Sequence, residues 1–128
     1  MKRQASCSCG KLKVTCPAEP RLVSLCHCTA CQKRTGSPYG IAAFFSRLDV
    51  EITGDFNSWR RSSDNGFEVE FHFCPECGAT VFWEPGRKPS LIAVGVGSFG
   101  DPSFPAPTQE VHVESRHNWV CPLRTHRP

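Results

Sequence analysis

Seven of the nine cysteines fall in three short clusters, and this spacing constrains the fold more than any other feature of the sequence. The clusters read Cys7-Ser8-Cys9-Gly10, Cys26-His27-Cys28-Thr29-Ala30-Cys31 and Cys74-Pro75-Glu76-Cys77-Gly78. Zinc is the natural partner of thiolates, and a structural zinc site takes four ligands in a tetrahedron. Seven ligands therefore divide into one group of four and one group of three.

The start of the chain bears on the redox state of these thiols. "MKRQASCSCG" has two basic residues but no apolar run behind them, so we do not expect a signal peptide, and the longest apolar run, 41–45, is far too short to span a membrane. We therefore expect a cytoplasmic protein with no membrane association. In a reducing cytosol the cysteines are expected to be metal ligands or catalysts rather than disulfides.

Two pairings could supply the group of four. Joining Cys28/Cys31 with Cys74/Cys77 leaves 42 residues between the pairs, whereas the two-knuckle motif has about 15–20. Joining Cys7/Cys9 with Cys74/Cys77 is favoured because each of these pairs is followed by a glycine, which adopts the positive φ that a tight knuckle often needs. The sequence therefore predicts a structural zinc on Cys7, Cys9, Cys74 and Cys77.

The remaining three cysteines, Cys26, Cys28 and Cys31, can hold a metal from one side and leave its fourth position open. An open position is typical of a catalytic zinc. Two alternatives stay open at this point. Cys16, Cys121 or His27 could close the site as a fourth ligand, or the three thiols could form a redox or sulfur-handling group without metal.

A zinc held by three thiolates carries much negative charge, so it is less suited to making hydroxide than a zinc held by imidazoles. It can still bind a thiol in its deprotonated form, and the sulfur can then add to the carbon of an aldehyde or, in reverse, release the aldehyde from a thiohemiacetal. The residues after Cys31 fit an anionic guest, because Lys33 and Arg34 supply charge while Gly36 and Ser37 supply a flexible backbone and a hydroxyl. The alternative is a solvated basic helix end followed by a glycine cap.

Short strands separated by glycine and proline predict a mainly β protein with at most short helices. Strands are expected at 11–16, 22–26, 39–45, 49–52, 67–73, 80–84, 91–96 and 110–114, and one short helix is expected at 29–34. At 67–73 the apolar and polar residues alternate, which places His72 on the polar face and predicts that it is exposed. Phe82, Trp83 and Trp119 are expected mostly in the core, with a pocket wall as the alternative.

Length and charge narrow the class further. The 128 residues suit a single domain, expected to span 1–128 with its core at about 7–119. The formal charge is only +3, and basic residues are scattered among acidic ones, which argues against nucleic-acid binding. Nothing in the sequence specifies an oligomeric state.

The stretches "CSCG", "CHCTACQKRTGSPY", "FCPECGATVFW" and "FPAPTQEVHVESRHNW" together resemble the glutathione-dependent formaldehyde-activating enzyme family, which includes the centromere protein V relatives. The resemblance runs from about Cys7 to Trp119. It implies a small zinc-bound β-sheet fold similar to the Mss4-like group. It also implies two zinc ions per chain, a structural one on Cys7, Cys9, Cys74 and Cys77 and a catalytic one on Cys26, Cys28 and Cys31.

The activity that this resemblance implies is that of a carbon–sulfur lyase, which forms or breaks S-hydroxymethylglutathione from glutathione and formaldehyde, or acts on a related thiol–aldehyde adduct. Glutathione would then be the substrate or co-substrate, with contacts expected at Lys33, Arg34, Gly36 and Ser37. The alternatives are a non-catalytic zinc-stapled domain that binds glutathione or another thiol, and a protein-interaction module.

Overall fold

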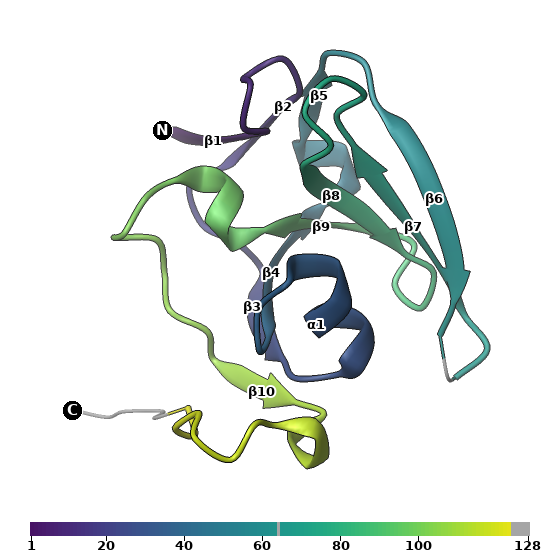
Figure 1. Cartoon of the computed structure of the whole chain (residues 1–128). Helices are drawn as coiled ribbons and strands as arrows, with labels where there is room; N and C mark the ends of the chain where they lie inside the picture. The colour runs from purple at the N-terminus through teal and green to yellow at the C-terminus, as the bar shows by residue number, and fades with distance from the viewer. Residues whose placement is uncertain (64, 124–128) are drawn as a thin grey trace.

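The computed structural model describes residues 1–63 and 65–123 and consists of two β-sheets and one α-helix (Figure 1). The small antiparallel sheet contains β1 (Lys2–Ser6), β2 (Lys13–Pro17) and β5 (Glu51–Thr53), in that order. The large sheet has the order β10 (Gln109–Val111), β3 (Leu22–Cys26), β4 (Gly40–Ser46), β9 (Leu91–Gly95), β8 (Thr80–Pro85), β7 (Glu68–Phe73) and β6 (Asn57–Ser62). The predicted mainly β architecture is therefore confirmed.

Each of the eight expected strands overlaps a strand of the structure, but two further strands were not predicted. These are β1 and β6, whose sequences are polar and lack a clear alternation. Each of the two strands forms one edge of its sheet, where fewer side chains need to be apolar. Five of the six β6 residues are exposed, and the strand is held by its antiparallel pairing with β7. β10 is shorter than expected, because His112 adopts a positive φ of 54° and a 3₁₀ helix, Val113–Ser115, follows.

Apolar side chains of the two sheets pack together as the main core. The core includes Leu12 and Val14 from the small-sheet side and Phe45, Phe82 and Ile92 from the large sheet, all at most 1% exposed. A second cluster, of Phe71, Trp83 and Ala93, forms on the other face of the large sheet. The expectation that Phe82 and Trp83 belong to the core is thus confirmed, whereas Trp119 is 72% exposed.

The α-helix of the described residues, α1 (Thr29–Thr35), connects β3 to β4 and lies beside β4 (Figure 1). Cys28 caps its N-terminus, since the Cys31 N–H donates to the Cys28 sulfur. The helix ends at Gly36, which has φ 69° and donates its N–H to the Gln32 carbonyl. The predicted helix and its glycine cap are both present, so the geometry of the segment after Cys31 is explained locally.

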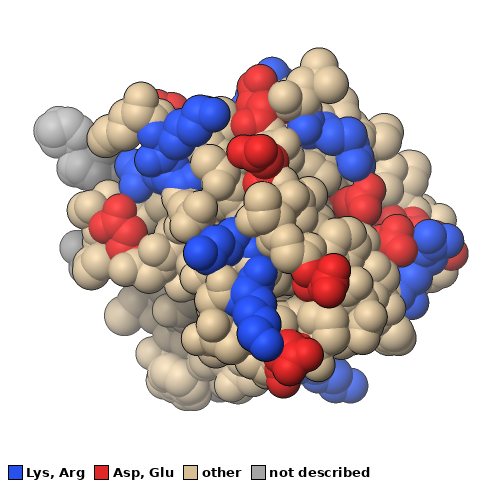
Figure 2. All heavy atoms as spheres, turned by 90° about the horizontal axis from the view of Figure 1, so that it is seen from above, with Lys and Arg blue, Asp and Glu red and all other residues tan. Residues whose placement is uncertain are grey.

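Two short 3₁₀ helices, Arg47–Asp49 and Val96–Phe99, complete the fold. Within the described part of the chain, no helix is both long and apolar enough to cross a membrane. On the face that Figure 2 shows, Lys and Arg side chains are interspersed with Asp and Glu. That face has no stripe of one sign, the feature that marks a phosphate-backbone binding surface.

Candidate metal centres and the adjoining cavity

The structure brings Cys7, Cys9, Cys74 and Cys77 together, with their sulfur atoms all within 4.8 Å of one another. The Cys7 and Cys9 sulfurs are 3.6 Å apart, as are those of Cys9 and Cys74, and all four thiols are free of disulfides. A tetrahedron with Zn–S bonds of 2.3 Å separates its sulfurs by about 3.8 Å. The number, chemistry and spacing of these donors therefore fit a closed four-thiolate zinc site.

The turns around this cluster have the geometry that was expected from the sequence. Gly10 and Gly78 both adopt positive φ, 83° and 77°, directly after the two cysteine pairs. The backbone N–H of Leu12 donates to the Cys7 sulfur at 3.2 Å, and that of Glu76 donates to the Cys74 sulfur at 3.4 Å. Such N–H donors favour the thiolate form, which is the form that binds metal.

The middle cluster consists of the half-buried Cys26, Cys28 and Cys31, whose sulfurs also lie within 4.8 Å of one another. Cys26 ends β3, and the other two lie at the start of α1. The Cys28 N–H donates to the Cys26 sulfur at 3.5 Å, and the Cys31 N–H donates to the Cys28 sulfur at 3.3 Å. These three donors fit one metal held from one side.

No fourth histidine, cysteine or carboxylate joins the middle cluster among residues 1–63 and 65–123. Cys16 is fully buried in the main core, where burial raises the pKa of its thiol to about 12. Cys121 is exposed and belongs to neither cluster. The remaining candidate for a fourth ligand is His27, whose Nε2 is paired with Glu110.

His27 is completely buried, and its Nε2 donates to Glu110 at 2.6 Å. The backbone carbonyl of His27 accepts from the Gln32 side chain, which also donates to the Ser115 carbonyl. The His27 N–H donates to the Val111 carbonyl. The loop that carries the middle cysteines is therefore fastened to the segment 110–115, far away in sequence, and His27, between Cys26 and Cys28, makes part of this attachment.

Arg34 brings positive charge to the middle cluster. The pKa of the Cys31 thiol is lowered from 9.0 to about 5, first by hydrogen bonding from the thiols of Cys26 and Cys28 and then by the charge of Arg34. The Arg34 guanidinium stacks on Trp83, with 4.3 Å between its central carbon and the ring centroid. Arg34 is thus held between an aromatic ring of the sheet and the thiol three residues before it.

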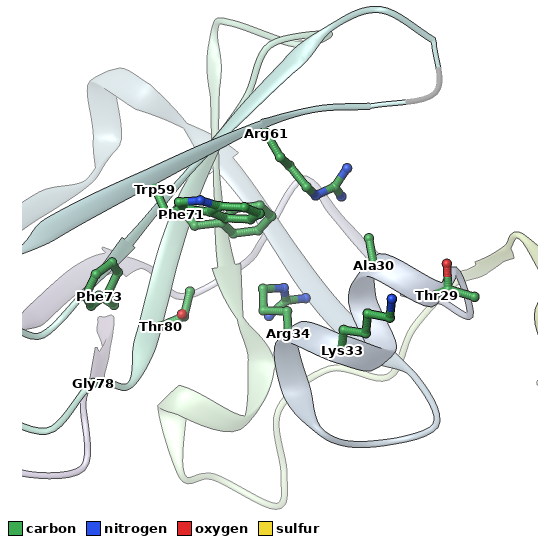
Figure 3. Close-up of a pocket in the computed structure, with 10 residues that line it drawn as sticks. All are labelled: Thr29, Ala30, Lys33, Arg34, Trp59, Arg61, Phe71, Phe73, Gly78 and Thr80. Carbon is green, nitrogen blue, oxygen red and sulfur yellow. The ribbon is translucent and has the colours of Figure 1, made fainter.

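A cavity of about 630 Å³ opens between α1 and the sheet (Figure 3). Its described lining residues are Thr29, Ala30, Lys33, Arg34, Trp59, Arg61, Phe71, Phe73, Gly78 and Thr80. Figure 3 shows Lys33 and Arg34 on the helix side, with Trp59 and Phe71 opposite them on the sheet. Thr29 and Ala30 are the two residues between Cys28 and Cys31, so the cavity begins within one helical turn of the middle cluster.

The residues expected to contact glutathione are divided between two places. Lys33 and Arg34 line the cavity, whereas Gly36 and Ser37 line a smaller hollow together with Gln32, Lys33, Pro38 and His117. Lys33 borders both. Sequence reasoning missed Trp59 and Arg61, because strand β6 was not predicted, and it identified Phe71 and Phe73 only as the dry face of a strand.

The expectation that His72 is exposed is wrong. Its side chain is 4% exposed, with the Ser58 hydroxyl donating to Nδ1 and Nε2 donating to Glu84, each at 2.7 Å. Phe56 covers the ring, with 4.7 Å between the centroids. His72 is therefore a buried histidine with both nitrogens paired, and it is covered by the segment 56–58 and by strand β8.

Comparisons with known proteins bear on fold and family. The model of the family described as "Glutathione-dependent formaldehyde-activating enzyme" matches residues 2–115. A crystal structure of a Rhodobacter sphaeroides protein, a structural-genomics target, superposes with a TM-score of 0.59 at 20% identity, over 84% of this chain and 99% of that chain. At this identity the likeness shows the fold alone. No curated protein matches the chain.

Proposed function

The chain belongs to the glutathione-dependent formaldehyde-activating enzyme family, and on that premise we propose that it is a zinc-dependent carbon–sulfur lyase acting on S-hydroxymethylglutathione. In the forward direction a bond forms between the sulfur of glutathione and the carbon of formaldehyde, and the thiol proton passes to the carbonyl oxygen, which becomes a hydroxyl. In the reverse direction the carbon–sulfur bond breaks and the proton returns to sulfur. No oxidant or reductant is needed.

The observation that carries this proposal is a three-thiol cluster next to a cationic cavity, with Arg34 neighbouring Cys31 and lining that cavity. Cys26, Cys28 and Cys31 supply three ligands, and no fourth lies within reach among the described residues. A zinc ion bound there would hold a thiol in its deprotonated, nucleophilic form at neutral pH. The role of the three cysteines is then to hold the ion and to leave one position for the substrate.

The cations beside the cluster bind and orient the substrate. Glutathione carries two carboxylates, and Lys33 and Arg34 lie within one turn of Cys31 on the wall of the cavity. Because Lys33 also borders the hollow lined by Gly36 and Ser37, the second carboxylate can reach that hollow while the thiol stays near the cluster. Charge-assisted hydrogen bonds of this kind fix orientation as well as affinity.

The cluster of Cys7, Cys9, Cys74 and Cys77 is proposed to hold the structural zinc. It joins the turn after β1 to the turn after β7, two segments that are far apart in the chain. Coupled metal binding and folding at such a site is worth ~10 kcal/mol, which a small core needs. The proposal therefore assigns two zinc ions to each chain.

The test is the exchange rate between glutathione plus formaldehyde and their adduct, measured by NMR with zinc counted in the same sample. The wild-type chain should contain two zinc ions and accelerate the exchange. Cys28→Ser should contain one and show no acceleration, and Cys121→Ser, which removes a thiol outside both clusters, should behave as wild type. Saturable binding of glutathione without acceleration would instead make the chain a thiol-binding module, and full activity in Cys28→Ser would refute the assigned site.

A further inference from the structure

The wall of the cavity that faces α1 is aromatic, and one of its rings is largely unburied. Trp59 is 59% exposed although it is a large apolar side chain on the edge strand β6. It stacks on Phe71, with 6.3 Å between the ring centroids and 25° between the planes. Exposed aromatic surface inside a concavity is typical of a binding site. We therefore expect a ligand of this cavity to have an apolar part that covers the aromatic wall.

The strand register explains why these rings form one surface. Trp59 on β6 pairs with Phe71 on β7, and Phe71 pairs with Trp83 on β8. Residues that oppose one another across paired strands point to the same face of a sheet. The three rings therefore form a row across three strands, and Arg34 lies above Trp83 at the inner end of that row.

The charge of the cavity indicates which polar group a bound ligand would carry beside its apolar part. Lys33, Arg34 and Arg61 are cationic, and none of the described lining residues is acidic. The central guanidinium carbons of Arg34 and Arg61 each lie 5.6 Å from the ring centroid of Phe71, so these two cations pack against the aromatic wall. The cavity thus favours an anion that also carries a flat apolar group.

Glutathione and formaldehyde do not account for this wall. The peptide of glutathione is polar and charged, so it satisfies the cations, while formaldehyde adds a single carbon to the sulfur. The cavity, at about 630 Å³, is of the size that binds drug-sized molecules. A larger group on the carbon next to the sulfur would extend past Arg34, which neighbours Cys31 and lines the cavity, to the rings.

We propose that this site takes thiol–aldehyde adducts whose aldehyde carbon carries an aromatic or similarly flat apolar group, and that Trp59 determines this specificity. The inference rests on the proposed function, because it assumes that the sulfur of the adduct binds at the middle cluster. The bond changes are those given above, since the carbon–sulfur bond forms or breaks while the added group is unchanged.

The experiment compares two stable thioethers by calorimetry on the zinc-loaded full chain. S-benzylglutathione mimics the adduct of an aromatic aldehyde without its hydroxyl, and S-methylglutathione mimics the formaldehyde adduct in the same way. Burial of a phenyl group is worth roughly ten- to a hundredfold in affinity. The benzyl compound should therefore bind at least about tenfold more tightly than the methyl compound.

Variants of Trp59 identify the source of this preference. Trp59→Ala should lower the benzyl-to-methyl affinity ratio to about a third of its wild-type value or less, and Trp59→Phe should retain most of it, since stacking by one aromatic ring is worth about 0.5–1.5 kcal/mol beyond burial. Trp119→Ala, which removes an exposed tryptophan outside the cavity, should leave the ratio unchanged. Zinc content and circular dichroism of each variant establish that the fold is retained.

The outcomes separate this inference from the proposed function. A ratio near one in the wild-type chain, failure of both compounds to bind, or a ratio that Trp59→Ala leaves intact would each overturn the specificity assigned here. Exchange of glutathione with formaldehyde, followed in the same preparations, reports the proposed function independently. Acceleration of that exchange together with a ratio near one would leave the lyase standing and remove only the aromatic specificity.

Discussion

Arg34 occupies the space that a side chain at position 40 would need. A Cβ atom placed on Gly40 would stand 2.8 Å from Nη2 of Arg34 and 3.4 Å from Cβ of Cys31. Gly40 lies in β4 opposite Cys26 of β3. The absence of a side chain on one strand therefore lets the guanidinium lie between the middle cysteines and the aromatic face of the sheet.

This relationship predicts the effect of Gly40→Ala on substrate binding. The added methyl group should displace the end of the flexible Arg34 side chain, which costs little stability but would remove the charge-assisted contact to glutathione that is proposed for Arg34. Affinity for glutathione should fall about tenfold, corresponding to roughly 1.5–2 kcal/mol for a hydrogen bond to a charged group. Calorimetry with glutathione measures it, and two zinc ions should remain bound.

Gly97→Ala is the matched control for that change. Gly97 and Gly40 line one hollow together with Arg34, distinct from the hollow at Gly36 and Ser37, but a Cβ on Gly97 would meet nothing within 4 Å. Its affinity for glutathione should match that of the wild-type chain. Equal affinities in the Gly40→Ala and Gly97→Ala variants would mean that the position of Arg34 does not matter for binding.

A second glycine is predicted to be essential for the small sheet. Gly54, directly after β5, has φ 99°, and a Cβ on it would stand 2.0 Å from the backbone carbonyl oxygen of Lys11. Gly54→Ala should destabilise the chain by about 3 kcal/mol or more, because steric overlap with backbone adds to the cost of the positive φ. Thermal and denaturant unfolding measure the loss.

Gly66→Ala separates the two causes. Gly66 has φ 85°, but a Cβ there would meet nothing within 4 Å, so only the cost of the backbone conformation applies. That cost is about 1 kcal/mol. If Gly54→Ala and Gly66→Ala lower stability equally, the close approach of Lys11 contributes nothing.

Removal of one ligand from the four-cysteine cluster is predicted to act through the metal rather than through packing. Cys9 is exposed, so Cys9→Ser removes a thiolate without opening a cavity in the core. The variant should lose one zinc ion and several kcal/mol of stability, since metal binding at such a site is coupled to folding. Elemental analysis and thermal unfolding provide the readouts.

Cys121→Ser is the control, because Cys121 is also exposed but belongs to neither cluster. It should retain both zinc ions and the wild-type melting temperature. A Cys9→Ser variant that keeps two zinc ions and full stability would show that the first cluster is not a structural metal site.

The pair of His72 and Glu84 predicts a pH dependence of stability. Burial raises the pKa of Glu84, but hydrogen bonds from His72 and Arg47 outweigh it and lower the pKa below the ordinary value of 4.5. A lowered carboxyl pKa stabilises the fold above the unfolded-state value, and that stabilisation is lost as pH falls through the folded-state value. Glu84→Gln should therefore be less stable than wild type at pH 6.

The difference in unfolding free energy between wild type and Glu84→Gln should shrink between pH 5 and pH 3, as measured by denaturant unfolding at each pH. Acid would also protonate the cysteines proposed as zinc ligands, but it would do so in both proteins, so the difference isolates Glu84. A difference that stays constant over this range would show that the carboxyl group does not titrate with a lowered pKa.

Much of the candidate site could be predicted because its information is local. The spacing of the cysteines and the glycine after each outer pair predicted which thiols meet, and the structure brings the same four and the same three together. The helix after Cys28 was also predictable, since its cap and its glycine end lie within the segment itself. That these clusters hold zinc stays a prediction from their donor chemistry.

The β class, the helix and the grouping of the cysteines follow from local patterns, because alternation, capping and cysteine spacing act over a few residues. Tertiary structure makes strands of the polar segments β1 and β6, since their hydrogen bonds come from partners elsewhere in the chain. It also decided that His72 is buried, through Ser58, Glu84 and Phe56. The cavity arose in the same way, because packing alone places Trp59 and Arg61 opposite helix α1, which follows Cys28 and contains Cys31.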